Sequence, residues 1–257
     1  MFAYSDENGK YKIENIGKTD GWLYVNRKGY RSDSVKIEWN ENKTSKADFF
    51  INRNPQLDSI IFSSIVVNKY PDVKMYSFFV AAKVMDDEND IDSVFITNEN
   101  FAVKEKLDYN LSTGFFEGVF KLSDFNISNV DQIIGKYFDL FVLDKNGFSF
   151  NVGEENIKRI IKDNIKFISP ASEETVSSPF DLRWERYSPG FDFTYEIKVF
   201  TQEISPEVIW EKRDLPKETI FYKITDEIPS GDYFWVIYCI DEFHNRGSSK
   251  PATFSIE

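Results

Sequence analysis

One acidic run, residues 86–92, has the residue types and spacing of a cation-binding loop. It reads Asp86-Asp87-Glu88-Asn89-Asp90-Ile91-Asp92. Calcium takes six to eight oxygen ligands, which closely spaced carboxylates and amides on a loop can supply. The run lacks the glycine and the final glutamate of an EF-hand loop. We therefore predict either a solvated acidic turn or a calcium site, the sequence indicating no other cofactor; the candidate ligands are Asp86, Asp87, Asn89, Asp90 and Asp92.

Paired carboxylates at three other places could in principle perform acid–base chemistry. A glycosidase needs two carboxyl groups roughly 5–10 Å apart in a cleft, with shifted pKa values. These pairs lie instead in segments with no apolar cleft signature, and phosphate-binding, nucleophile-elbow and dinucleotide motifs are absent from the sequence. We predict a protein that is not an enzyme, with a carboxylate-pair hydrolase as the weaker alternative; the pairs are Glu154-Glu155, Glu173-Glu174 and Asp226-Glu227.

The chain has one histidine and one cysteine. A single histidine argues against a histidine-rich zinc site and against a Ser-His-Asp triad, so His244 is predicted to be a loop residue. Cys239 alternates with Trp235 and Ile237, which predicts a buried, unreactive side chain, with a reactive thiol as the alternative.

Aromatic residues are the second candidate for binding. Aromatic faces stack on sugar rings and anchor protein partners. Four aromatic residues have a less certain inward placement than the rest, although packing against a core or a sheet face is the simpler interpretation: Trp22, Trp39, Trp210 and Tyr187.

Composition limits the classes of partner. The 257 residues are 41% hydrophobic and 17% aromatic, which is enough apolar material for packed cores. The net charge of −12, without a basic cluster, argues against binding to nucleic acid or to an anionic membrane. The sequence contains no apolar run of the roughly 20 residues that span a bilayer. Its first residues also lack the pattern of a signal peptide.

Strong alternation marks the last segment of the chain as a β-sandwich of about seven strands. Large apolar residues occupy every second position, as expected where one face of each strand is buried. The clearest runs are Phe180–Trp184, Tyr195–Val199 and Tyr233–Asp241.

This segment, about residues 165–257, resembles a fibronectin type III or similar immunoglobulin-like domain. Trp184 stands where such domains carry a core tryptophan on the second strand. Tyr233, after the turn 229–232, stands where they carry the tyrosine that opens the sixth strand, and residues 241–247 look like their last hairpin. The resemblance implies a spacer or binding module, although one fold hosts many functions.

The first 54 residues read as about five short strands. Their order resembles the second half of a carboxypeptidase regulatory-like domain, a transthyretin-like sandwich that is not a peptidase. The residues that carry this resemblance are Asp6-x-x-Gly9-x-Tyr11-x-Ile13, Leu23-x-Val25, Lys28-Gly29-Tyr30 and Phe49–Ile51.

The opening strands of that family have no counterpart before Phe2. The chain would then be a fragment, or another chain would complete the sheet, because an open edge is a template for pairing. One hypothesis is a homodimer formed through this edge.

Residues 55–163 read as an immunoglobulin-like sandwich of a generic bacterial type. Predicted strands include Leu57–Val67, Met75–Met85, Ile91–Thr97, Phe101–Leu107, Phe115–Leu122, Tyr137–Leu143 and Phe148–Val152. Asn129 or Ser123 is suited to begin one helical turn. The tyrosine, strand and turn that begin at Tyr137 resemble those that begin at Tyr233, which indicates an internal repeat. Residues 154–163 are predicted as a strand or an extended linker.

We therefore predict an all-β chain of tandem sandwiches with domains at 1–54, 55–163 and 164–257, joined stiffly because no Gly/Ser-rich linker intervenes. The resemblances imply an exported or surface-associated bacterial protein, with a lipoprotein as one form. Its role would be that of a spacer, adhesion or partner-binding module that meets a protein or a glycan at the cell surface. The alternative is the carbohydrate-binding accessory region of a polysaccharide-degrading system.

Overall fold

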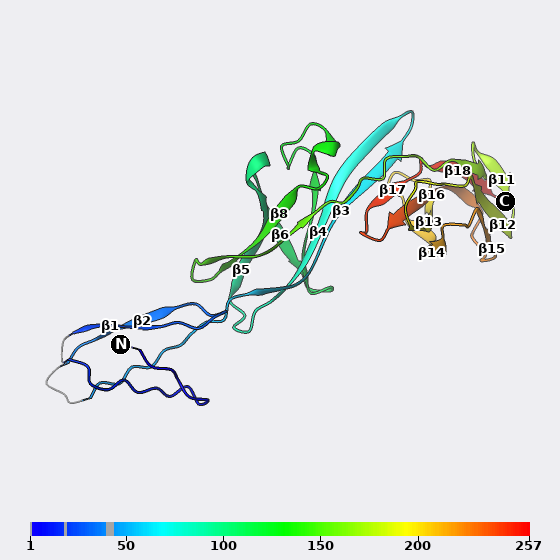
Figure 1. Cartoon of the computed structure of the whole chain (residues 1–257). Helices are drawn as coiled ribbons and strands as arrows, with labels where there is room; N and C mark the ends of the chain where they lie inside the picture. The colour runs from blue at the N-terminus through cyan, green and yellow to red at the C-terminus, as the bar shows by residue number, and fades with distance from the viewer. Residues whose placement is uncertain (1, 18–19, 40–43) are drawn as a thin grey trace. The chain divides into compact units, whose positions relative to one another are not determined.

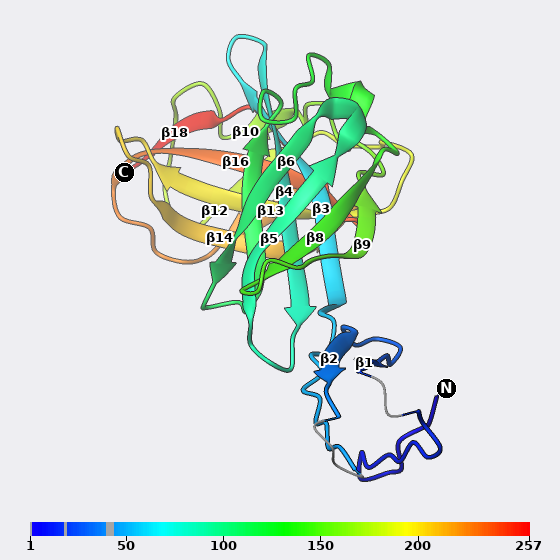
Figure 2. The same ribbon diagram turned by 90° about the vertical axis from the view of Figure 1, so that its left-hand side faces the viewer.

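The computed structural model describes residues 2–17, 20–39 and 44–257, which are almost entirely β-structure (Figures 1 and 2). Contacts divide the chain into two compact units, residues 1–54 with 86–89 and residues 55–85 with 90–257. Across the described residues, no helix is long and apolar enough to cross a membrane. The predicted fold class, all-β with tandem sandwiches, is confirmed.

The first unit contains one antiparallel strand pair, β1 (Gly21–Val25) and β2 (Asp33–Ile37). Trp22 lies opposite Lys36, and Tyr24 lies opposite Ser34. No residue in the described part of this unit is buried, so these residues form no hydrophobic core of their own.

The prediction of about five strands in residues 1–54 is wrong for the described residues. Neither Tyr11–Ile16 nor Asp48–Ile51 forms a strand, although the Tyr11 hydroxyl donates to the Ala47 carbonyl at 2.6 Å. A two-stranded sheet with no apolar layer packed on it is only marginally stable. The Tyr11–Ile16 and Asp48–Ile51 segments therefore gain little stability by pairing with the β1–β2 sheet. The resemblance to a carboxypeptidase regulatory-like domain stays a prediction.

The second unit begins with a sandwich built around the long β3–β4 hairpin (Figure 1). Strand β6 pairs with β5 through its first half and with β7 through its second half, so it joins the two sheets at one corner. The capping box of Asn129 opens the one-turn helix η2, as predicted for Asn129. The elements are β3 (Gln56–Lys69), β4 (Val73–Met85), β5 (Ile91–Asn98), η1 (Glu99–Phe101), β6 (Val103–Asn110), β7 (Phe115–Lys121), η2 (Val130–Ile133), β8 (Tyr137–Asp144) and β9 (Ser149–Asn156).

Phenylalanine rings fill the core of this first sandwich. Phe125 lies 5.1 Å from Phe78 and 5.2 Å from Phe138, measured between ring centroids, and all three are fully buried. Such aromatic contacts add to the hydrophobic stabilisation of the two facing sheets. After β9 the chain continues without regular structure from residue 158 to residue 166, which agrees with the predicted extended linker.

The second sandwich has nine short strands where about seven were predicted, because three-residue pairings add to the main ladders. Strands β10, β12 and β15 form one sheet, and β11, β18, β16, β13 and β14 form the facing layer. The strands are β10 (Phe167–Ser169), β11 (Glu174–Val176), β12 (Phe180–Trp184), β13 (Phe193–Thr201), β14 (Val208–Pro216), β15 (Phe221–Ile224), β16 (Gly231–Asp241), β17 (Arg246–Ser248) and β18 (Ala252–Ile256).

The core of the second sandwich contains the predicted aromatic residues. Trp184 is 1% exposed and lies 6.4 Å from Trp235, whose indole N–H donates to the Pro170 carbonyl at 2.8 Å. The Tyr233 hydroxyl donates to the Pro229 carbonyl at 2.8 Å, which is the tyrosine-corner contact of immunoglobulin-like sandwiches. The predicted placement of Trp184 and Tyr233 is confirmed.

A buried aspartate begins an equivalent hairpin turn in both sandwiches, at the end of β8 and of β16. Asp144 accepts hydrogen bonds from the backbone N–H groups of Asn146 and Phe148 at 2.8 and 2.9 Å. Asp241 accepts from those of Phe243 and Asn245 at 2.9 and 2.8 Å. The backbone hydrogen bonds to the two aspartates therefore match, as expected of an internal repeat, and Asp241 also accepts from the Asn245 side-chain amide.

The two sandwiches of the second unit share a sheet. Strand β17 pairs in parallel with β3, with Arg246 opposite Ile65 and Gly247 opposite Val66 (Figure 1). The resulting sheet runs from β11 through β17 and β3 to β9. We call this region, the β17–β3 pair with the side chains that flank it, the joint.

Buried polar side chains reinforce the joint. The Asn245 amide oxygen accepts hydrogen bonds from the backbone N–H and the hydroxyl of Ser64, at 2.9 and 3.0 Å. Asn68 donates to the Ser248 carbonyl at 2.6 Å. Because a buried polar group that loses its partner is destabilising, each of these contacts favours one arrangement of the two sandwiches.

A glycine is needed where the linker crosses β17. A Cβ atom on Gly247 would lie 2.6 Å from both the carbonyl oxygen and the Cγ2 atom of Ile161. Real Cβ atoms do not approach backbone this closely, so any larger residue would push the linker away from the sheet.

Replacing Gly247 with alanine should lower the free energy of unfolding by about 1–3 kcal/mol, as overpacking does elsewhere. Urea denaturation followed by tryptophan fluorescence would measure the change. Gly21→Ala is the control, since a Cβ there meets nothing within 4 Å. Equal stability of the Gly247 variant and the wild type would contradict the close approach.

Candidate functional site

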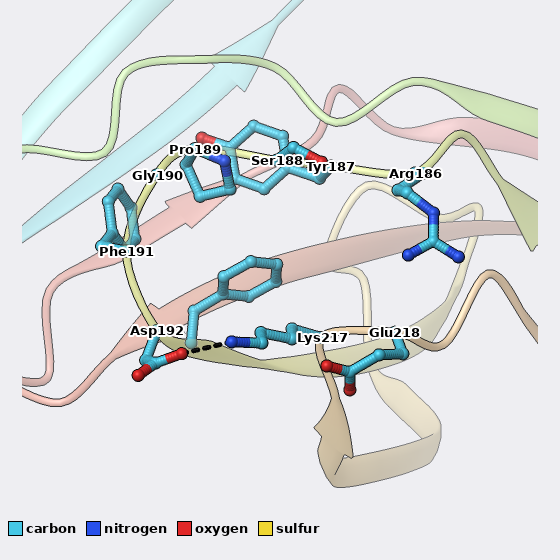
Figure 3. A pocket seen from close by; sticks show the side chains of 10 residues that line it. Arg186, Tyr187, Ser188, Pro189, Gly190, Phe191, Asp192, Lys217 and Glu218 are labelled. Atoms are coloured by element: carbon cyan, nitrogen blue, oxygen red, sulfur yellow. Dashed lines mark hydrogen bonds and ion pairs between the residues drawn. The ribbon is translucent and has the colours of Figure 1, made fainter.

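An open hollow of about 380 Å³ lies at one end of the second sandwich (Figure 3). It is lined by residues 186–193, which connect β12 to β13, and by Lys217 and Glu218 after β14. The loop contains Pro189-Gly190 between two aromatic residues, and Gly190 takes a φ of 85°, which favours glycine. The turn at Gly190 thus places Tyr187 and Phe191 on either side of the bend.

Aromatic contacts anchor the loop to the core of the sandwich. The Tyr187 ring packs edge-on against Phe193 at 5.6 Å, and Phe191 packs against Phe193 at 6.2 Å. Phe193 in turn meets the fully buried Tyr195 at 4.9 Å. Tyr187 and Phe191 stay half-buried, so each keeps part of its ring at the surface of the hollow.

Arg159, from the linker between the sandwiches, holds the Phe191 side of the hollow. Its guanidinium lies 4.4 Å from the Phe191 ring centroid and 5.2 Å from that of Phe243. The same guanidinium meets the buried Asp241 at 3.4 Å and Glu242 at 3.0 Å. One wall of the hollow therefore rests on a residue of the joint.

Two charged groups at the hollow are paired and two are not. Lys217 forms an ion pair with Asp192 (Figure 3). Its hydrogen bond and charge lower the pKa of Asp192, while Asp192 raises the pKa of Lys217. Arg186 and Glu218 are exposed, and within the part of the chain that the structure describes neither side chain has a hydrogen bond or an ion pair.

The ionisable groups of the hollow keep their usual charge states. The ion pair with Lys217 lowers the pKa of Asp192, so this carboxylate stays ionised. Burial raises the pKa of the Tyr187 phenol well above its usual value, so this hydroxyl stays protonated and neutral. The hollow offers aromatic surface, one neutral hydroxyl and two uncommitted charged groups.

The acidic run lies in the loop between β4 and β5. Asp87 forms an ion pair with Arg53 at 2.8 Å, and Glu88 accepts a hydrogen bond from the Arg53 backbone N–H at 2.9 Å. Asp90 accepts from the Asn146 amide at 3.3 Å. Among the described residues, no group of three or more His, Cys, Asp or Glu side chains is placed to hold a metal ion. A calcium site at residues 86–92 stays a prediction.

Trp22 is the most exposed of the four tryptophan and tyrosine candidates. Its side chain is 60% exposed, and Tyr24, two residues along the same strand, is 72% exposed. Successive odd or even residues of a strand share a face, so both rings lie on one side of the β1–β2 pair. Tyr24 was not among the aromatic residues predicted from the sequence as binding candidates.

The other tryptophan candidates are engaged in the fold. The Trp210 indole N–H donates to the Asp226 carboxylate at 2.7 Å, and its ring lies 5.4 Å from Tyr222. Trp39 is partly buried, and its backbone N–H donates to Asp20 at 3.0 Å. Of the four, only Tyr187 contributes to the hollow.

The three carboxylate pairs do not meet in one place. Glu155 on β9 forms an ion pair with Lys158 at 2.7 Å. Asp226 is bound to Trp210, and Glu174 opens the short strand β11. Each pair thus serves its own surface, and none of them lines the hollow.

Cys239 and His244 lie where the sequence predicts them, the cysteine in the core and the histidine in a loop. Cys239 is fully buried, and burial together with the nearby Asp241 raises the pKa of its thiol far above the usual value. His244 is exposed at the tip of the β16–β17 hairpin with a φ of 64°.

Tyr187 is the one residue of the hollow that was predicted from the sequence as a binding candidate. Arg186, Phe191 and Glu218 have no distinguishing spacing, although a Pro-Gly pair between aromatic residues marks an exposed turn. Arg159 and Phe191 are far apart in the sequence, so no local pattern could predict their contact.

Solved structures that resemble this chain are distant from it in sequence, and two of them are fibronectin-type modules. No protein-family model and no curated protein sequence matches the chain. Fibronectin(III)-like modules of Clostridium thermocellum CbhA align with 79% of this chain and 92% of their own, at 13% identity and a TM-score of 0.34. The FN1–FN3 domains of chicken CNTN1 align with 79% of this chain and 64% of their own, at 12% identity and a TM-score of 0.29.

Proposed function

We propose that the chain is a non-enzymatic support that holds a binding surface at a fixed distance and orientation, within an exported or surface-associated bacterial protein. The observation that carries this proposal is the joint, in which one sheet and buried polar contacts unite two sandwiches. A support needs this kind of connection, since short polar linkers alone leave domains free to reorient.

Charge supports the same role. Residues 55–257 contain 35 Asp and Glu against 21 Lys and Arg. A net charge far from zero keeps a protein soluble and suppresses self-association of its surfaces. A long β-rich support that stands in solvent benefits from this property.

A carbohydrate-binding accessory role is the second candidate. Two observations favour it: the exposed pair Trp22 and Tyr24 on one strand face, and the aromatic hollow around Tyr187. Aromatic faces with polar neighbours bind ligands that have both apolar and hydroxyl surfaces.

Stiffness of the joint tests the support role. Spin labels on cysteines introduced at the fully exposed Leu111 and Ile204 would report the distance between the sandwiches by double electron–electron resonance, while the buried Cys239 stays unlabelled. We expect a narrow distance distribution that broadens in Asn245→Ala, because each unsatisfied buried group at Ser64 costs about 1–3 kcal/mol.

Asn98→Ala is the matched control for that measurement. Asn98 is 6% exposed and bonds to Phe101 and Tyr137 within one sandwich. Its loss should destabilise that sandwich without broadening the distribution. A broad distribution in the unaltered chain would exclude a stiff support.

Location in the cell tests the exported role. Fractionation of the source cells, with the protein detected by antibody, should find it in the envelope or the medium, and a lipid mass on the purified protein would identify a lipoprotein. Recovery in the cytosol alone would contradict export.

A second copy of the chain is the partner that we propose for the β1–β2 pair. Both outer edges of a two-stranded sheet offer backbone groups for pairing, and this unit has no buried side chain among its described residues. Multi-angle light scattering should show a mass that rises towards twice 30.1 kDa with concentration. A constant monomer mass would refute the dimer.

A further inference from the structure

The hollow beside the 186–193 loop presents aromatic rings and uncommitted charged groups next to one another. Tyr187 and Phe191 line it, and Figure 3 shows Arg186 and Glu218 at the end away from Phe191. We propose that this hollow binds a sugar unit of a neutral glycan chain. The proposal deepens the binding role given above, on which it rests, by naming the site and the class of ligand.

Other classes of ligand fit the hollow less well. A drug-like apolar molecule needs a pocket that buries most of its surface, whereas this hollow is open and has a charged rim. Polyanions would meet the acid excess of residues 55–257, and Asp192 already neutralises Lys217. A peptide that extends a sheet needs a free strand edge, but the hollow lies between a loop and a turn.

A sugar ring matches both surfaces of the hollow. Its C–H faces are apolar and pack on aromatic rings such as Tyr187. Its edge carries neighbouring hydroxyl groups, to which a carboxylate or a guanidinium makes two parallel, charge-assisted hydrogen bonds. Glu218 and Arg186 are free to do so, since neither is engaged within the described residues.

The walls of the hollow are held in place before a ligand arrives. Phe193 supports both Tyr187 and Phe191, and Arg159 covers the Phe191 ring at 4.4 Å. A side chain that becomes ordered only on binding loses entropy, which weakens affinity. Rings that are fixed beforehand avoid this loss, which matters for a neutral sugar because it has no charge to add affinity.

The test is a titration of the whole chain with soluble neutral hexasaccharides, namely cellohexaose, xylohexaose, mannohexaose, laminarihexaose and chitohexaose. Calorimetry and saturation-transfer NMR should show that at least one of them binds. Tyr187→Ala and Arg186→Ala should each weaken that binding roughly tenfold or more.

Two further variants locate the site. Tyr137→Ala removes a more exposed aromatic ring, 57% exposed on the first sandwich, and should leave affinity unchanged. Trp22→Ala should also leave affinity unchanged. Loss of binding in Trp22→Ala with retention in Arg186→Ala would place the glycan on β1 and overturn the proposal.

Folding of the variants is checked by circular dichroism. Because Tyr187 packs on Phe193, Tyr187→Ala can unfold part of the sandwich. In that case the affinity of Arg186→Ala is the test of the site, since Arg186 is exposed and its loss should not affect folding. If none of the five hexasaccharides binds, the proposal is wrong. Binding that survives Arg186→Ala would keep the carbohydrate-binding role and refute this site, whereas absence of binding would refute both, so the two failures are distinguishable.

Discussion

The buried carboxylate of Asp241 is the group on which the connection between the sandwiches depends. A buried charge is strongly unfavourable unless hydrogen bonds and an opposite charge surround it. Asp241 accepts bonds from two backbone N–H groups of its own turn and from the Asn245 amide, and it faces the Arg159 guanidinium. Satisfying this carboxylate fixes the β16–β17 hairpin, orients Asn245 towards Ser64 and holds the linker residue Arg159 against the second sandwich.

An equivalent hairpin occurs in the first sandwich. There Asp144 caps an equivalent turn, but the residue corresponding to Asn245 is Phe148, which is 47% exposed. A phenylalanine cannot accept the hydrogen bonds that Ser64 donates. The repeated turn is therefore a folding element common to both sandwiches, and in the second copy Asn245 uses it to bind Ser64 of the first sandwich.

Local patterns were enough to predict the sandwiches, because alternation and the residues around Trp184 and Tyr233 report which side of a strand is buried. They were not enough for the joint, since Ser64 and Asn245 are 181 residues apart and both look like ordinary polar residues. They overstated the strands of residues 1–54, where apolar alternation has no second layer to pack against. In the candidate site, Tyr187 could be predicted as an aromatic residue of uncertain placement. Arg159 and Glu218 could not, because only the fold brings Arg159 onto Phe191 and Glu218 to the edge of the hollow.

Phe191 lies in the wall of the hollow and also contacts the Arg159 guanidinium, so one ring connects the hollow to the joint. Any ligand that changes how tightly this ring is held changes the free energy of the Arg159 contacts, and by reciprocity those contacts change the affinity of the ligand by the same factor. A substitution that removes the Arg159 contacts is therefore expected to alter the surface that the hollow offers, although Arg159 itself does not line it.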